Sequence, residues 1–302
     1  YGIDLSMEKF DVNYIDQNSK KKNKRVKNRL FEMSEFLNTV PDNSVLCAEN
    51  TGPYGDLLVF LCNQMGIKIA LVSGYTIKHS FGMIKGKSDT IDAERIREYG
   101  ERFSDKLIFK QYDTEDVFEL KSLYALRSQL VKACKILQTG KHSRVNAPMQ
   151  SISTKRHTEK ALKELRSEIR KIEDEIEVII LNNEELKENY ELVTSITGIG
   201  PVIATDLIIK TGNFKTINTA RKAASYAGIC PFPDQSGKMR GKGKISPFGD
   251  KKLKSLLYMG TRSAVKHNKE YRLYYQKKQL EGKPHYLIMN NVSNKMLRTI
   301  YS

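Results

Sequence analysis

The chain has 302 residues, with 51 Lys and Arg against 35 Asp and Glu, so its net charge is +16 and its isoelectric point is near 9.5. Hydrophobic residues make up 39% of the chain, a share that excludes intrinsic disorder and, at this length, predicts about two domains. The longest apolar run, Leu57 to Cys62, is far short of the roughly 20 residues that span a bilayer, and no segment resembles a signal peptide.

The first hundred residues alternate between strand and helix patterns. Short apolar or alternating segments predict strands at 2–6, 10–14, around Val26, 45–48 and 68–72. Helices are expected at 30–38, 55–65 and 88–99. Three early strands followed by alternating helices and strands predict a mixed α/β sheet.

Residues 111–190 are expected to form a helical spacer. Apolar residues recur at three- and four-residue spacing along 123–137 and 162–179, the pattern of a coiled coil. The stretch 140–153 between them contains Pro148 and predicts a turn. Two such helices pair either with each other as a hairpin or with another chain, and the sequence leaves both arrangements open.

Residues 191–302 are predicted to be mainly helical, with glycine-rich breaks. The segment Gly198-Ile199-Gly200-Pro201 before an apolar helix resembles the hairpin of a helix-hairpin-helix, in which backbone N–H groups approach a phosphate. An ordinary connection between helices accounts for it equally well. Helices expected at 219–226 and 251–265 flank a stretch rich in Gly, Pro and Lys.

Two basic segments predict contact with nucleic acid. Residues 20–29 carry seven Lys and Arg and no acid, and residues 235–254 carry seven against the single acid Asp250. A basic surface that only keeps the protein soluble is the alternative. The predicted contacts, with the two glycines of the hairpin-like turn, are Lys20, Lys21, Lys22, Lys24, Arg25, Lys27, Arg29, Gly198, Gly200, Lys238, Arg240, Lys242, Lys244, Lys251 and Lys252.

The four cysteines are widely scattered, and the five histidines form no ligand-spaced group. We therefore expect free thiols in a reducing compartment and no His- or Cys-based metal site.

Acidic residues in the first domain predict a site for a divalent cation. Asp4 lies within an apolar strand and Glu49 at the end of another, while Asp89 and Asp92 share one face of a helix. Carboxylates that converge from such elements would bind one or two hard cations, for which Mg²⁺ is the natural choice. Each acid also has an ordinary explanation: a helix cap or first-turn acid for Asp89, and a solvent-facing strand position for Asp4 and Glu49.

Blocks at both ends of the chain resemble the insertion-sequence one-ten family of bacterial mobile-element recombinases, relatives of the pilin-gene invertases. The N-terminal blocks are GIDLS at 2–6, ENTGPY at 49–54 and KSDTIDA at 87–93. The C-terminal blocks are ITGIGP at 196–201, ASYAGI at 224–229 and QSGK at 235–238. Their joint order along nearly the whole chain is specific, whereas one block alone would be weak.

The resemblance implies a RuvC-like domain with an RNase H fold at 1–110, a coiled-coil spacer at 111–190 and a transposase domain at 191–302. It implies that Asp4, Glu49, Asp89 and Asp92 are catalytic and hold Mg²⁺, and that Ser236 is the nucleophile that cuts and rejoins DNA. It further implies a structured guide (bridge) RNA that pairs with donor and target DNA, and a cytoplasmic bacterial homo-oligomer, a dimer or tetramer, whose active sites combine different protomers.

Other functions remain open from the residues alone. A Ser-Gly pair in a Lys- and Gly-rich loop is common turn chemistry, and Ser225, Tyr226 and Ser246 compete with Ser236. No His lies near Ser236 in the sequence to act as its base, and residues 246–250 replace a stretch that is usually more basic in the family. The first alternative is a junction-resolving endonuclease that uses the same acids with water. The second is a non-catalytic nucleic-acid-binding protein whose carboxylates are structural.

Overall fold

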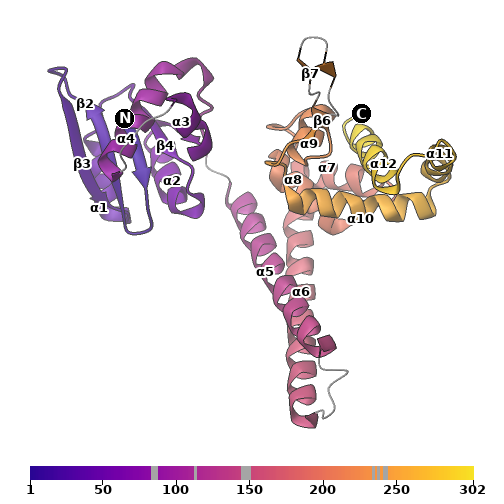
Figure 1. Ribbon diagram of the computed structural model, residues 1–302. Helices are drawn as coiled ribbons and strands as arrows, with labels where there is room; N and C mark the ends of the chain where they lie inside the picture. The colour runs from indigo at the N-terminus through magenta and orange to yellow at the C-terminus, as the bar shows by residue number, and fades with distance from the viewer. Residues whose placement is uncertain (83–87, 112–113, 144–150, 233–234, 237–238, 241–243) are drawn as a thin grey trace. The chain divides into compact units, whose positions relative to one another are not determined.

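We describe a computed structural model of the chain that covers residues 1–82, 88–111, 114–143, 151–232, 235–236, 239–240 and 244–302 (Figure 1). The chain divides into two compact units, Tyr1–Asp113 and Thr114–Ser302, which are described separately. The first is a mixed α/β unit and the second is mainly helical, as the sequence predicts.

A five-stranded sheet organises the first unit, with strand order β3-β2-β1-β4-β5. The antiparallel part joins β1 (Gly2–Leu5), β2 (Lys9–Ile15) and β3 (Lys21–Lys27), and the parallel part joins β1, β4 (Val45–Glu49) and β5 (Lys68–Val72). Strands β1, β2, β4 and β5 match the predicted strands to within one residue at each end, and β3 contains Val26, around which a strand is predicted.

Helices cover this sheet because alternate strand residues are apolar on both faces. Ile3, Leu46 and Ala48 pack into the core formed with α1 (Leu30–Asn38) and α2 (Asp56–Gln64). Cys47 packs instead with Ile77 of α3 (Gly74–Ser80) and with Ile96 and Tyr99 of α4 (Asp89–Arg102). Two short 3₁₀ turns, Gly52–Gly55 and Ser104–Lys106, complete the unit.

Gly2 allows α4 to lie directly on β1. A Cβ atom at this position would lie 2.1 Å from the carbonyl oxygen of Ala93 and 2.2 Å from the backbone nitrogen of Arg97. Arg97 is buried beside this contact and donates from Nε to Oδ1 of Asn13 at 2.6 Å. The close approach brings the first turn of α4 toward the strand that carries Asp4.

A helical hairpin begins the second unit. Helices α5 (Glu115–Ser143) and α6 (Ile152–Asn182) pack along each other within one chain, as in the hairpin that the sequence allows (Figure 1). Tyr124 of α5 and Ile172 and Ile176 of α6 are buried in the core shared with the C-terminal helices. Part of the predicted turn, residues 144–150, lies outside the described residues.

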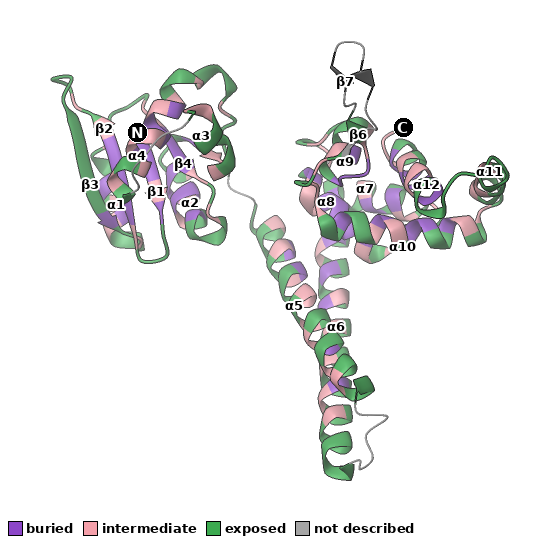
Figure 2. Ribbon diagram, viewed as in Figure 1, coloured by how far each residue is buried: buried purple, intermediate pink, exposed green. Residues whose placement is uncertain are grey.

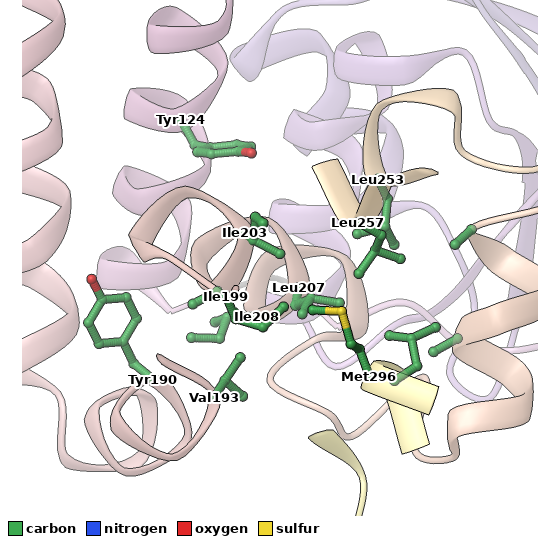
Figure 3. Packing of buried hydrophobic residues seen from close by; sticks show 14 of the residues in the cluster. Tyr124, Tyr190, Val193, Ile199, Ile203, Leu207, Ile208, Leu253, Leu257 and Met296 are labelled. Atoms are coloured by element: carbon green, nitrogen blue, oxygen red, sulfur yellow. The ribbon is translucent and has the colours of Figure 1, made fainter. Parts of the chain in front are cut away.

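The rest of the second unit packs around α8 (Pro201–Thr211). Figure 3 shows Ile203 and Leu207 of this helix among Leu253, Leu257 and Met296. The surrounding helices are α7 (Glu184–Thr194), α9 (Ala220–Tyr226), α10 (Lys251–His267), α11 (Lys269–Leu280) and α12 (His285–Ile300). Short strand pairs lie between α9 and α10: β6 (Pro231–Phe232) with β9 (Lys244–Ile245), and β7 (Gln235–Ser236) with β8 (Met239–Arg240).

Two other sequence expectations concern cysteines and membranes. Cys47, Cys62, Cys134 and Cys230 are all free, as expected, and the first three are buried. Among the described helices, none combines the length and the apolar character that crossing a bilayer requires.

Candidate active site

The four predicted acids lie on three neighbouring elements of the first unit. Asp4 and Glu49 each follow the paired residues Ile3 and Ala48 of the parallel strands β1 and β4. Asp89 and Asp92 belong to the first turn of α4, whose N-terminal cap is the Ser88 hydroxyl, an acceptor for the Ile91 amide at 3.3 Å. Parallel pairing and the packing of α4 on β1 thus bring acids from distant parts of the sequence into one region of the first unit.

Electrostatics show that these acids influence one another. Burial, as the largest cause, and the neighbouring charges of Glu49, Asp92, Asp89 and Asp11, in that order, together raise the pKa of Asp4 to about 6. A hard divalent cation would relieve this repulsion, and carboxylate oxygens are the ligands that such a cation prefers. The donor set therefore has the chemistry that suits a divalent metal ion.

Cationic side chains hold two of the four acids. The Asp89 carboxylate is about half exposed and accepts a hydrogen bond from Lys9 Nζ at 3.0 Å, which lowers its pKa, with Arg25 as a second cation at 3.8 Å. Asp92 Oδ1 accepts from Arg95 at 3.1 Å. Within the described residues, no three Asp, Glu, His or Cys side chains lie close enough together to hold a metal ion. The acids share one region, but their side chains are not arranged as a metal centre.

Glu49 and Asp92 line one cavity of about 490 Å³ at the end of the sheet. Its wall also includes Tyr75 of α3 and Arg95 of α4. The cavity is partly open to solvent, and both acids belong to its wall, so a phosphate or a metal ion that entered it could reach them.

Gly74 makes room for the Glu49 side chain, and sequence reasoning missed it. A Cβ atom at Gly74 would lie 2.1 Å from Glu49 Oε1. The carboxylate thus occupies the space that any other residue would fill at the first position of α3. The available signal was Ser73-Gly74 directly after the predicted strand 68–72, where a site at the end of a parallel strand is expected.

Ser236 belongs to the second unit. It lies in β7, where it pairs with Met239 of β8. Figure 1 shows β7 farther from the helices of the second unit than β6. Ser236 belongs to the segment 229–248, whose two ends lie close together. The backbones of Gly228 and Gly249, which flank the segment, meet there: a Cβ atom at Gly228 would lie 3.1 Å from the Cα atom of Gly249. The Asp250 amide donates to the Tyr226 carbonyl at 2.7 Å beside this contact.

Comparison with known proteins identifies the family of the chain. Residues 1–145 match the DEDD family of IS110 elements, described as "Transposase", and residues 190–276 match the "Transposase IS116/IS110/IS902 family". The chain belongs to the IS110 family of transposases. Membership makes DNA the partner of this transposase, and cutting and rejoining of DNA its general activity.

Full-length relatives of the transposase support the assignment. The chain is 26% identical to the pilin gene-inverting protein of Moraxella bovis over 271 residues, which covers 85% of the chain and 80% of that protein. It is 25% identical to a probable family 20 transposase of Pseudomonas aeruginosa, with 88% and 83% covered. It is 24% identical to the transposase for insertion sequence element IS1111A of Coxiella burnetii, with 89% and 78% covered.

The first group of predicted nucleic-acid contacts, residues 20–29, lies on and beside an edge strand of the first unit. Residues 21–27 form the exposed edge strand β3, but Arg25 pairs with Asp11 and Lys21 pairs with Glu94. Lys20 and Arg29 are exposed at its two ends, and Lys22, Lys24 and Lys27 are exposed along it. Whether this strand binds nucleic acid stays a prediction.

In the second unit, packing accounts for part of the predicted set. Gly198 has a φ of +98° and lies against α10, where a Cβ atom would come within 2.4 Å of the Gly260 carbonyl oxygen, whereas nothing lies within 4 Å of a Cβ atom at Gly200. Lys252 donates to the Ser128 hydroxyl at 2.6 Å, while Lys251 is exposed. Arg240 and Lys244 lie in β8 and β9, and Lys238 and Lys242 lie outside the described residues.

A buried ion-pair cluster in the second unit was not predicted. Asp206 lies in the middle of α8 with none of its side chain exposed, and Lys210 Nζ is 2.9 Å from its Oδ2 atom and 2.7 Å from Oδ1 of Asp250. Burial alone would lower the pKa of Lys210, but hydrogen bonds to Asp250 and Asp206 outweigh it and raise the pKa. Asp250 also caps α10 by accepting from the Leu253 amide at 2.7 Å. The sequence signal was an Asp inside an otherwise apolar helix.

Replacement of Asp4 by Asn is expected to stabilise the transposase above pH 6. Because the folded-state pKa is raised from 3.8 to about 6, ionisation of Asp4 opposes folding increasingly as the pH rises through this window. Because Asp4 is only partly buried, solvent weakens the effect, and we expect the free energy of unfolding to rise by about 1 kcal/mol at pH 7.5. Below pH 4 the carboxyl is protonated in both states and the gain disappears. Urea unfolding with a chelator present measures it. The exposed Asp105→Asn serves as control, and equal gains in both variants would contradict the local explanation.

Proposed function

We propose that this transposase is an RNA-guided DNA recombinase of an insertion sequence. It would have a RuvC-like, RNase H-fold domain with four metal-binding acids and would cut and rejoin DNA through a covalent phosphoserine at Ser236. The observation that best supports the four-acid site is the pairing of Ile3 with Ala48, which places Asp4 and Glu49 at neighbouring positions of two parallel strands. The raised pKa of Asp4, caused by burial and by the nearby acids, agrees with this placement.

The acids would hold Mg²⁺ between the ends of β1 and β4 and the first turn of α4. Bound there, the cation would neutralise phosphate charge and stabilise the leaving oxygen. Binding would compete with Lys9 for Asp89 and with Arg95 for Asp92, so both acids would exchange a cationic side chain for the metal ion.

The chemical step would be an exchange of one phosphate ester for another. The Ser236 hydroxyl oxygen forms a bond to phosphorus, one deoxyribose oxygen leaves, and the serine proton passes to a carboxylate while the departing oxygen gains a proton. The phosphoserine conserves the energy of the broken ester, so a second DNA hydroxyl can reverse the step without ATP. The chain contains no GxxxxGK[ST] phosphate loop, which agrees with this.

A protein–DNA adduct tests the serine step. We expect the purified transposase, incubated with element ends, guide RNA and Mg²⁺, to give a denaturation-resistant adduct that Ser236→Ala abolishes and Ser246→Ala retains. Asp89→Asn or Asp4→Asn should abolish strand exchange. Cleavage by Ser236→Ala at the wild-type rate, with free DNA ends, would instead establish a water-using endonuclease.

The guide RNA is tested separately. The proposal that a structured RNA selects donor and target rests on the family resemblance and on the +16 charge, which suits a polyanion. RNA encoded beside the reading frame should copurify with the protein, and changing its pairing segments should redirect the target. Recombination that is indifferent to those segments would contradict RNA guidance.

A further inference from the structure

Aromatic side chains from three helices meet on the surface of the second unit. The hydroxyl of Tyr258 on α10 lies 3.2 Å from Nε2 of His285, and that of Tyr275 on α11 lies 2.8 Å from its Nδ1. A neutral imidazole has one donor and one acceptor, so one hydroxyl donates to it and the other accepts from it. The ring of Tyr286 is roughly parallel to that of Tyr258, with centroids 6.2 Å apart at 27°. We call Tyr258, Tyr275, His285 and Tyr286 the ring cluster.

The ring cluster faces solvent although it is ordered by contacts. Tyr286 is 76% exposed, His285 is exposed, and Tyr258 and Tyr275 are half-buried. The adjoining helix α11 contains no buried residue, which Figure 2 shows as a helix without purple. Packing of the core therefore does not require these rings, yet both ring nitrogens of His285 are held by hydroxyl groups. These contacts hold the exposed rings in place before any ligand binds.

The surroundings are strongly basic. Residues 251–302 contain twelve Lys and Arg but only two acids, Glu270 and Glu281. Lys254 and Arg262 lie one helical turn to either side of Tyr258 on α10, and both are exposed. Glu281 is paired with Lys278 at 2.7 Å. A positive surface with exposed aromatic rings matches the chemistry of a nucleic-acid strand whose bases are unpaired.

We propose that the ring cluster binds unpaired bases of a single-stranded nucleic acid. A base would stack on the exposed face of Tyr286, and cations such as Lys254, Arg262 and Lys283 would contact the flanking phosphates. The strand is RNA or DNA, because the π faces of their bases are alike. A protein partner fits less well, since it would have to supply an unusually acidic face to this nearly acid-free region.

Binding of labelled single strands tests the proposal. Fluorescence anisotropy of the full chain is measured with a 20-nucleotide RNA, the DNA of the same sequence and the corresponding DNA duplex. Tyr286→Ala should weaken binding of a single strand roughly 5- to 100-fold, and Tyr286→Phe should retain it because the ring face remains. The matched control is Leu280→Ala, which removes another exposed side chain of the same unit, 90% exposed, and should leave affinity unchanged.

Salt dependence separates stacking from charge. Tyr286→Ala should leave the slope of log affinity against log salt unchanged, whereas Lys283→Ala should reduce it by about one. Loss confined to RNA assigns the surface to a guide, and loss confined to DNA assigns it to a displaced strand. Wild-type affinity of Tyr286→Ala for both single strands, or an equal loss on the duplex, would overturn the proposal. Because no cleavage is measured, failure here is distinct from failure of the phosphoserine proposal.

Discussion

Substitution of Lys210 by Met is expected to lower the free energy of unfolding of the second unit by about 3–5 kcal/mol. The ammonium group lies between Asp206, which is fully buried, and Asp250, which is one-quarter exposed. Its removal leaves Asp206 with Lys252, 3.6 Å from its Oδ1 atom, as the remaining cation within ion-pair distance among the described residues. Urea denaturation followed by circular dichroism measures the change.

The matched control for Lys210 is Lys215→Met. Lys215 pairs with Glu185 on the surface, where both side chains are more than half exposed, and such pairs contribute about 0–1 kcal/mol. Adding Asp206→Leu to Lys210→Met should recover most of the loss, because the uncompensated buried charge is then removed. A loss below 1 kcal/mol in Lys210→Met would mean that the ion pair contributes little to the fold.

The second large effect concerns activity without loss of stability. Gly74→Ala is expected to reduce the rate of DNA cleavage about 100-fold or more, because the new methyl group takes the position of Glu49 Oε1 and displaces the carboxylate. The backbone at Gly74 lies outside the left-handed region, so Ala is tolerated and suits the helix better than Gly. Single-turnover cleavage and thermal unfolding of the same preparation measure the two effects.

A shorter side chain at position 49 provides the control. Glu49→Asp alone shortens the side chain and moves the carboxylate away from its wild-type position. In the Gly74→Ala background, the shorter side chain also avoids the clash with the new methyl group. The double variant should therefore be more active than the product of the single effects predicts. Gly74→Ala with wild-type cleavage would show that the position of Glu49 is not critical for the reaction.

Local patterns were sufficient for most of the first unit. The helix at 30–38 and the strand at 68–72 have the predicted bounds, because apolar periodicity and strand burial coincide there. Helix α3 was missed since its seven residues give only one buried side chain, Ile77. Helix α11 was missed for a related reason: with no buried residue it carries little apolar periodicity.

The candidate site could be predicted only in part. Strand ends and a helix start indicated which acids would come together, but the pairing of Asp89 with Lys9 depends on a tertiary contact. Lys9 reaches Asp89 across 80 positions, and Lys210 reaches Asp250 across 40. Glycines illustrate the same limit: Gly198 is a turn signal in the sequence, while its contact with Gly260 is visible only in the folded unit.

The contact between Gly228 and Gly249 has a consequence for how such proteins can diverge. The helical scaffold fixes both ends of the serine-bearing segment at one point, so inserted residues would extend its reach without moving any helix. Closing a loop of twice the length costs only about 0.6 kcal/mol in chain entropy. The segment that carries Ser236, the proposed nucleophile, can thus be lengthened at little cost in free energy, provided that Gly228 and Gly249 remain small where their backbones meet.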